Sequence, residues 1–316
     1  MAQRSAAVFG AEGFIGGYLV PYLRTAGFAT TAVSQHAIPA PSRIRGVRYA
    51  SACDVTDARR VNSIVRQARP DLVFHLAAMS SPTVSWSAPW ATIQVNARGT
   101  LNVLEAIRRL APGTRVFVAC SSAEYGHGHR AGTPTAETAG LLPLHPYGVS
   151  KVAQDLLAYQ YFTNYGVRTI RGRIFNTIGP GKTGEVTSDI ARQLVAIERG
   201  ARPKVVRVGN LNARRDFTDV RDMVRAMVSI TQRGKAGEVY NLASGREHSV
   251  RDVLRTLIDL SRTHATWKVE RSRLRPTDEP YIVGNADRLR RATGWSPHFT
   301  LRRTLEDILD AFRALP

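Results

Sequence analysis

Short apolar runs alternate with longer segments of helical periodicity along the first half of the chain. Ala6–Phe9 and Ala29–Val33 are apolar runs of strand length, and between them apolar residues recur at helical spacing from Tyr18 to Thr25. The other predicted elements are strands at 72–78, 116–120 and 168–174 and helices at 92–110 and from 147 onward. This alternation predicts an α/β fold whose parallel strands present their carboxyl ends at one edge of a sheet.

A glycine-rich turn joins the first predicted strand to the first helix. Glycine recurs at every third position, at Gly10, Gly13 and Gly16, with Phe14 and Ile15 inside the turn. Glycines let the backbone approach a pyrophosphate, and the helix N-terminus supplies amide donors and the positive end of a dipole. An ordinary turn between strand and helix is the alternative. The place of this turn inside a strand-helix frame favours dinucleotide binding by all five residues.

The end of the second predicted strand bears on which dinucleotide is bound. An NAD enzyme usually offers a carboxylate there to the adenosine ribose, but the strand ends at Ser34 and residues 25–52 contain no acidic residue. The omission favours NADP, with Arg43 or Arg45 as partners of its 2′-phosphate.

Further cofactor contacts follow from the next predicted strands. Asp54 is positioned to accept from the adenine amino group, although it could instead cap the helix that begins near Asp57. Small residues after the strand at 72–78 leave room for a flat cofactor, whereas His75 within it is predicted to be a packed core residue. The remaining predicted contacts are Val55, Leu76, Ala77, Ala78 and Asn96.

Composition limits the classes of partner. The formal net charge of +19 comes from 44 basic and 25 acidic residues, but the arginines are scattered, without a basic tail or interleaved aromatics, so no nucleic-acid partner is predicted. Scattered arginines also suit an anionic substrate. No apolar run reaches the length of a membrane span and the start resembles no signal peptide, so a cytoplasmic protein without membrane contact is expected. Cys53 and Cys120 lie in or beside apolar runs and are predicted to be buried, reduced thiols.

Candidate chemistry centres on Tyr147 and Lys151, which lie one helical turn apart and so share a helix face. A lysine beside a tyrosine stabilises a phenolate, which is a general acid or base for interconverting a hydroxyl and a ketone. Ser121 follows the strand at 116–120, where it can reach a substrate hydroxyl. His127 and His129 lack a third ligand nearby, so no metal site is predicted.

Several motifs, in order along the chain, resemble the extended short-chain dehydrogenase/reductases that modify nucleotide sugars. They are Val8–Gly16, His75-Leu-Ala-Ala, Asn96-Ala-Arg-Gly-Thr, Ser121-Ser-Ala-Glu-Tyr-Gly, Tyr147-Gly-Val-Ser-Lys151, Arg173-Ile-Phe-Asn-Thr-Ile-Gly-Pro and Gly294-Trp-Ser-Pro. The resemblance implies a Rossmann domain with a doubly wound parallel sheet, a Ser121/Tyr147/Lys151 active site and a smaller mixed α/β lobe for the sugar nucleotide. We expect residues 1–175, with about 214–243 returning, to form the first domain, and 176–213 with 244–316 to form the lobe.

Within this family the stretch from Gly179 to Asp222 looks most like the GDP-4-keto-6-deoxy-mannose reductases. That likeness implies that Arg215, Arg275 and Asn176 contact the diphosphate. It also implies that Ser122, Ala123 and Glu124 lie at the substrate. Dehydratases of the superfamily carry a glutamate base where this chain has Ala123, so redox chemistry at C4 is favoured and Glu124 is a neutral passenger or a sugar contact.

The predicted reaction is hydride transfer between a nicotinamide and C4 of a nucleotide-linked hexose. Tyr147 delivers or takes the hydroxyl proton at C4. Lys151 lowers the pKa of Tyr147 and holds the nicotinamide ribose, and Ser121 hydrogen-bonds the C4 oxygen. A 4-epimerase with tightly bound NAD(P)+ would use the same residues and is the main alternative, ahead of a 4,6-dehydratase or a non-catalytic dinucleotide sensor. The family resemblance also implies a homodimer formed by the helices that begin near Asn96 and Tyr147.

Overall fold

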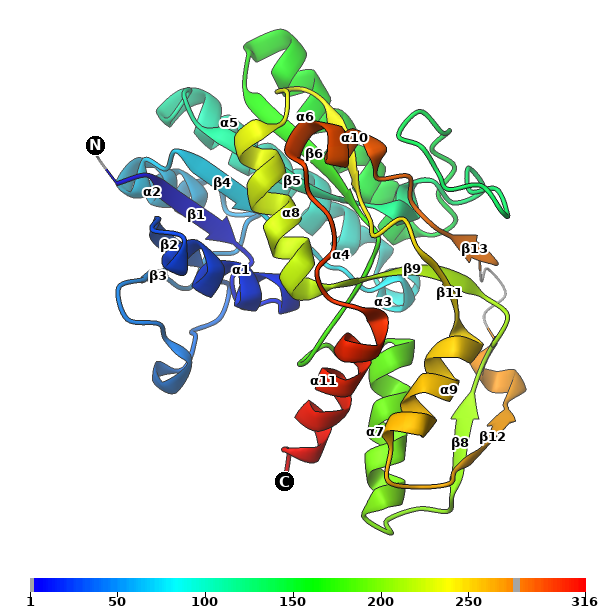
Figure 1. The fold of residues 1–316 in the computed structure, drawn as a ribbon. Helices are drawn as coiled ribbons and strands as arrows, with labels where there is room; N and C mark the ends of the chain where they lie inside the picture. Colours follow the sequence, from blue (N-terminus) through cyan, green and yellow to red (C-terminus); the bar gives the residue numbers. More distant parts are fainter. Residues whose placement is uncertain (1–2, 275–278) are drawn as a thin grey trace.

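The computed structural model describes residues 3–274 and 279–316. Among these residues a seven-stranded, all-parallel sheet runs in the order β10-β6-β5-β4-β1-β2-β3 (Figure 1). Its strands are β1 (Ser5–Phe9), β2 (Ala29–Val33), β3 (Arg48–Ala50), β4 (Leu72–His75), β5 (Arg115–Ser121), β6 (Arg168–Ile174) and β10 (Val239–Leu242). The order reverses beside β1, as in a doubly wound Rossmann sheet, so the predicted α/β fold is confirmed.

Helices cover both faces of this sheet (Figure 1). On one face, α1 (Phe14–Thr25) and α8 (Val220–Arg233) enclose a core that includes Leu19, Phe74 and Met227. The helices on the other face are α2 (Ala58–Ala68), α5 (Gly99–Leu110) and α6 (Pro146–Tyr165). Strands buried on both faces read as continuous apolar runs, which is why several of them were visible in the sequence.

A second core lies below the first in Figure 1. It is built on helices α7 (Val186–Glu198), α9 (Val250–Leu260) and α11 (Leu301–Arg313). The strands around it are β7 (Asn176–Ile178), β8 (Val205–Val208), β9 (Arg214–Asp219), β11 (Glu247–Ser249), β12 (Thr266–Val269) and β13 (Tyr281–Ile282). β9 pairs with β7, β11 and β13, whereas α10 (Asp287–Thr293) packs on α8 and β10 of the large sheet. The predicted domain boundaries stay a prediction, and we propose counting β9 with the lobe and α10 with the Rossmann domain.

Two predicted elements differ in detail from the observed ones. The helix predicted at 92–110 consists of α4 (Pro89–Ile93), a π-helical turn η2 (Gln94–Arg98) and α5. Such turns are common where a side chain serves a site, and Asn96 lies in this one. The strand predicted at 72–78 ends at His75, because its neighbour β1 turns away after Phe9.

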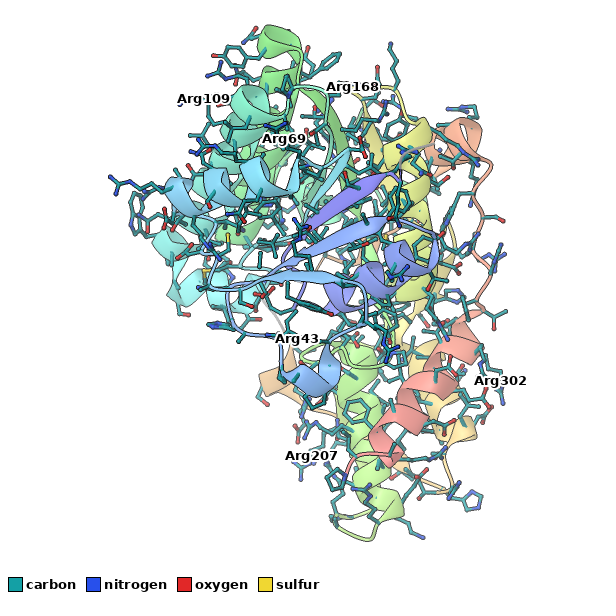
Figure 2. The ribbon with its side chains drawn as sticks, turned by 90° about the vertical axis from the view of Figure 1, so that its left-hand side faces the viewer. Arg43, Arg69, Arg109, Arg168, Arg207 and Arg302 are labelled. Atoms are coloured by element: carbon teal, nitrogen blue, oxygen red, sulfur yellow. The ribbon has the colours of Figure 1, made fainter. Side chains whose placement is uncertain are left out.

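Other predictions concern single residues. His75 is 1% exposed and bonds Thr100 Oγ1 at 2.9 Å, and burial lowers its pKa to about 3, which confirms a core histidine. Cys53 and Cys120 are buried free thiols, as predicted. The arginines are spread over the surface, as Figure 2 shows for Arg43, Arg69, Arg109, Arg168, Arg207 and Arg302. In the described part of the chain, every helix is too short or too polar to cross a membrane.

Candidate active site

The glycine turn has the shape of a phosphate cradle. Gly10 has φ +86°, and a Cβ on it would lie 2.7 Å from the backbone nitrogen of Ala77. A Cβ on Gly16 would lie 2.3 Å from the carbonyl oxygen of Gly10. α1 begins at Phe14 after Gly13, which offers its first amides no side-chain cap. Close backbone packing and free amide donors fit a dinucleotide pyrophosphate.

The residues predicted to hold the adenosine lie around the ends of β2 and β3. Ser34 is 1% exposed, with its hydroxyl 3.5 Å from Ser51 Oγ, so its side chain faces inward. Asp54 is exposed and its Oδ1 accepts from the backbone and the hydroxyl of Thr56, both at 2.8 Å. Asp57, rather than Asp54, caps α2, accepting from Arg59 and Arg60 N–H at 2.9 and 3.2 Å. Asp54 therefore remains available as a predicted adenine contact.

Asn96 braces the loop that follows β4. It is 0% exposed, its Oδ1 accepts from Met79 N–H at 2.8 Å, and its Nδ2 donates to Met79 O at 3.1 Å and Ser150 Oγ at 2.8 Å. The amide ties that loop to Ser150 of α6, the residue directly before the predicted catalytic lysine. The predicted contact residues Leu76, Ala77 and Ala78 lie partly exposed just before this brace, and Val55 is buried. Asn96 thus fixes the loop after β4 relative to α6, and its direct contact with cofactor stays a prediction.

The structure brings together the three residues predicted to be catalytic. Ser121 ends β5, and its side chain lies near enough to the Tyr147 phenol to lower the pKa of that phenol. The Lys151 ammonium lies 5.7 Å from the centre of the Tyr147 ring and donates to Ala119 O at 2.8 Å. Burial raises the pKa of Tyr147 to about 12 against the opposing effect of Ser121, and burial lowers the pKa of Lys151 to about 8. At neutral pH this arrangement holds a protonated phenol beside a mostly protonated ammonium.

A buried charge network underlies this group and was not recognised in the sequence. Glu124 Oε1 accepts from Ser121 N–H at 2.8 Å, while its Oε2 lies 3.2 Å from Arg173 Nε, which also donates to Asp155 Oδ2 at 2.9 Å. Glu124 and Asp155 are 0% exposed. Burial, with Asp155 adding to it, raises the pKa of Glu124 well above its usual range.

This network changes the interpretation of Glu124. Cys120, Glu124 and Asp155 are near enough to hold a metal ion, but the Arg173 guanidinium already supplies positive charge to both carboxylates. The buried position of Glu124 favours support of Ser121 over the predicted contact with a sugar, which stays untested. Only the spacing of Glu124 from Ser121 hinted at this role, through the capping box that the two residues form.

The predicted substrate residues lie along the edge shared with the lobe. Asn176 Nδ2 donates to Asp216 O at 3.4 Å. Arg215, from β9, is partly exposed, and its positive charge adds to burial in lowering the pKa of His129. Ser122 is 8% exposed and Ala123 is partly exposed. The predicted contact Arg275 lies outside the described residues. Contact of the other four with a diphosphate or a sugar stays a prediction.

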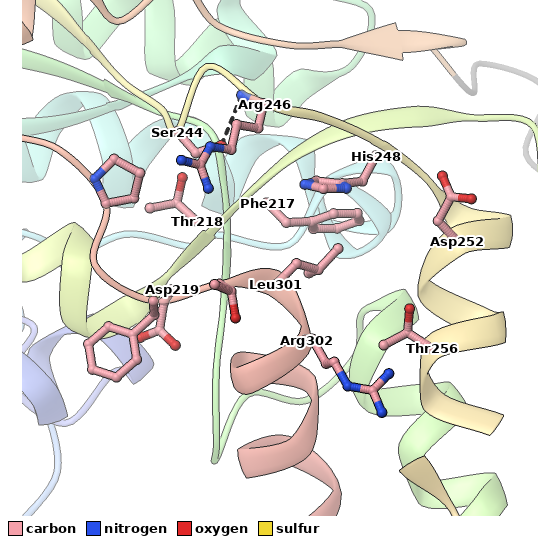
Figure 3. A pocket seen from close by; sticks show the side chains of 13 residues that line it. Phe217, Thr218, Asp219, Ser244, Arg246, His248, Asp252, Thr256, Leu301 and Arg302 are labelled. Carbon is pink, nitrogen blue, oxygen red and sulfur yellow. Dashed lines mark hydrogen bonds between the residues drawn. The ribbon is translucent and has the colours of Figure 1, made fainter. Parts of the chain in front are cut away.

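A separate cavity of about 310 Å³ opens between β9, β11, α9 and the start of α11 (Figure 3). Arg246 and His248 reach it from above, Asp252 and Thr256 from α9, and Arg302 from α11. Arg246 N–H donates to Ser244 Oγ at 3.1 Å, the contact dashed in Figure 3. None of the predicted site residues that the structure describes lines this cavity, so it is distinct from the Ser121/Tyr147/Lys151 group.

One carboxylate near the cradle was missed. Glu12, inside the glycine turn, accepts a hydrogen bond from Gln35 N–H at 2.6 Å, just beyond the end of β2. The sequence-based prediction of a ribose partner considered only residues 25–52, around the end of β2, and Glu12 lies outside that range. A glutamate between the first two glycines of the turn is the signal that would have found it.

Comparisons with known proteins agree with this geometry. The sequence profile of the family described as GDP-mannose 4,6 dehydratase matches residues 7–308. GDP-6-deoxy-D-mannose reductase from Pseudomonas aeruginosa is 32% identical over 96% of this chain and 95% of that protein. Among solved structures, RMD from P. aeruginosa complexed with NADPH has a TM-score of 0.86 at 30% identity, covering 99% of both chains. The Thermus thermophilus UDP-glucose 4-epimerase complex with NAD also has a TM-score of 0.86, at 25% identity over 98% of this chain and 99% of that chain.

Proposed function

Because the chain belongs to the GDP-mannose 4,6-dehydratase family of NAD(P)-dependent nucleotide-sugar enzymes, we propose that it transfers hydride at C4 of a nucleotide-linked hexose. The favoured reaction is reduction of a GDP-linked 4-keto-6-deoxy-mannose to the 6-deoxyhexose. The grouping of Tyr147 with Lys151, one helical turn away, and with Ser121 at the end of β5 is the observation that carries the proposal. The Pseudomonas reductase supports the choice of substrate.

The residues divide the work in the following way. A bound nicotinamide dinucleotide, held by the glycine cradle, would supply the hydride. Tyr147 donates its phenolic proton to the C4 oxygen, and Ser121 bonds the same oxygen and orients it. Lys151 keeps two ammonium protons beyond the one given to Ala119 O, enough to bond a ribose hydroxyl and to stabilise the phenolate that forms. Asn176 and Arg215 would hold the diphosphate from the lobe side.

Two features of the loop after β5 support redox chemistry over water elimination. Ala123 occupies the position at which dehydratases of the superfamily carry the glutamate that removes the C5 proton. The adjacent Glu124 is fully buried and engaged with Ser121 and Arg173, so it is poorly placed to remove a proton from a sugar. Both observations favour a reductase or an epimerase.

A 4-epimerase is the second candidate. The likeness to a UDP-glucose 4-epimerase complexed with NAD favours it, and the same three residues would serve oxidation and re-reduction at C4. An epimerase regenerates its cofactor in each turnover, whereas a reductase consumes one reduced dinucleotide per sugar.

That difference defines the experiment. The purified protein is incubated with GDP-4-keto-6-deoxy-mannose and, separately, NADH or NADPH, and absorbance of the reduced nicotinamide is followed. Stoichiometric loss of absorbance with formation of a GDP-6-deoxyhexose supports the reductase. If neither dinucleotide is consumed and C4 epimers of GDP- or UDP-hexoses form without added reductant, the reductase assignment is wrong and the epimerase is favoured.

We also propose that two copies pair through α6 and the helices that precede it. Trp86 of α3 (Pro82–Ser87) is 58% exposed and Trp90 of α4 is 70% exposed, and Leu156 and Tyr159 of α6 are also exposed. Large apolar side chains on adjoining helices are typical of a homodimer interface. Light scattering would test this, with a dimer expected for the natural protein and a monomer for Leu156→Lys.

A further inference from the structure

The glycine turn contains a carboxylate, that of Glu12, which lies at the end of β2. Glu12 is the third residue of the turn, and its Oε1 accepts from Gln35 N–H at 2.6 Å. Gln35 lies two residues beyond Val33, where β2 ends. A residue that is 23 positions away in the chain therefore places negative charge where residues 25–52 have none of their own.

This position is where a doubly wound fold binds the adenosine ribose. An acidic side chain at the carboxyl end of β2 normally accepts hydrogen bonds from the ribose diol. A carboxylate has about four lone-pair sites, and the bond from Gln35 uses one. The Glu12 side chain is exposed, so the remaining sites are open to a ligand.

One of the two arginines that were expected to bind a 2′-phosphate, Arg43, is held elsewhere. Arg43 Nε donates to Ile38 O at 3.0 Å, and its guanidinium lies 5.3 Å from the centre of the Tyr49 ring. Arg60, a further cation near this end, donates to Ser51 O at 2.7 Å. Releasing either guanidinium to a phosphate would break these contacts.

Charges of both signs act at this end of the sheet. Burial raises the pKa of the Cys53 thiol to about 11, Arg60 opposes the rise, and Asp54, Asp57 and Glu12 add to it. Three carboxylates thus act on one thiol beside the adenosine site. A 2′-phosphate at the ribose, which carries between one and two negative charges at neutral pH, would be repelled by the Glu12 carboxylate at the end of β2.

We infer that Glu12 makes the protein select NAD(H) over NADP(H), by accepting from the ribose diol in place of an acidic residue on β2. This preference for NAD(H) is the opposite of the NADP preference predicted from the absence of an acidic residue at the end of β2. The inference rests on the family's use of nicotinamide dinucleotides and not on the proposed reaction, so it applies equally to a reductase and to an epimerase.

Equilibrium binding tests the inference without any sugar substrate. Dissociation constants for NADH and NADPH are measured by titration calorimetry on protein stripped of nucleotide. The natural protein is expected to bind NADH at least about 10-fold more tightly, since one charge-assisted hydrogen bond is gained and a like-charge contact avoided. Glu12→Gln, which removes the charge and keeps an acceptor, is expected to bring the two constants within about 3-fold of each other.

Three further variants complete the test. Asp259→Asn removes a distant exposed carboxylate on α9 and is expected to leave the ratio of the two constants unchanged. Arg43→Ala and Arg45→Ala are expected to leave NADPH binding within about 2-fold of the natural protein. Tighter binding of NADPH by the natural protein, an unchanged ratio in Glu12→Gln, or loss of NADPH binding in either arginine variant would overturn the inference. Thermal melting of each variant checks that it is folded.

Discussion

Glu124 accepts a hydrogen bond from the backbone N–H of Ser121, with 2.8 Å between Oε1 and the nitrogen. The contact fixes the residue at the tip of β5 whose hydroxyl meets the Tyr147 phenol. The fully buried Glu124 carboxyl thereby orients the Ser121 hydroxyl. The resulting support of Ser121 can be tested directly.

Replacing Glu124 with alanine should lower both stability and turnover. Arg173 would lose one of its two buried carboxylate partners, and breaking a buried pair costs roughly 3–5 kcal/mol. Glu124→Gln keeps the size of the side chain and an acceptor for Ser121 N–H, so it should restore most of the kcat. Denaturant unfolding and steady-state kinetics measure both effects, and equal kcat losses in the two variants would contradict the positioning role.

Tyr147→Phe should reduce kcat by about 100-fold or more, because the variant lacks the proton that goes to the C4 oxygen. Dinucleotide binding should change little, since the ring and its packing on His145 remain. Tyr165→Phe at the exposed end of the same helix is the matched control and should keep normal kcat. A normal rate in Tyr147→Phe would remove this phenol from the mechanism.

The pH dependence of kcat/KM should reflect Lys151. Burial lowers its pKa to about 8, so the ammonium loses its proton as the pH rises through about 8 and the rate should fall on that side. In Lys151→Arg the guanidinium stays charged, and whatever activity remains should lose this alkaline decline. A pH profile of both proteins from 6 to about 10 is the measurement, and an identical decline in the variant would assign the titration to another group.

Gly16→Ala and Gly17→Ala should have opposite effects although the residues are adjacent in α1. A Cβ on Gly16 would lie 2.3 Å from Gly10 O, which would push the cradle apart, whereas one on Gly17 meets no atom within 4 Å. Gly16→Ala should therefore abolish measurable NADH binding, and Gly17→Ala should bind normally and gain about 0.5–1 kcal/mol in stability. Calorimetric binding and thermal melting distinguish the two, and retained binding in Gly16→Ala would exclude the cradle as the pyrophosphate site.

Acid should destabilise the protein partly through His75. Burial lowers its folded pKa to about 3 from an ordinary 6.5, so the unfolded chain binds the proton first and stability is lost as pH falls from about 6.5. By pH 4 the loss should be about 3 kcal/mol from this residue. Carboxyl groups also titrate over this range, so the slope of the unfolding free energy against pH is measured for the natural protein and for two variants. His75→Gln is expected to have a shallower slope, and His36→Gln, at an exposed histidine, is the control. Equal slopes in all three proteins would contradict the assignment.

The sequence by itself determined five strands of the large sheet, the glycine cradle and the pairing of Tyr147 with Lys151. β1, β4 and β5 are buried on both faces and therefore appear in the sequence as apolar runs, and Gly10 and Gly16 lie closer to neighbouring backbone atoms than any Cβ allows. Tyr147 and Lys151 could be paired because helical spacing alone brings them to one face. Such features depend on residues near one another in the chain.

Only the tertiary structure decided the partners of the charged residues. Glu12 meets Gln35, and Arg173 meets Glu124 and Asp155, across separations of 18 to 49 residues that no local pattern specifies. Whether a carboxylate faces a cofactor or a buried guanidinium depends on which strands become neighbours. A charged side chain takes its role from the charges and the solvent around it after folding, and this information is absent from the order of residues along one segment.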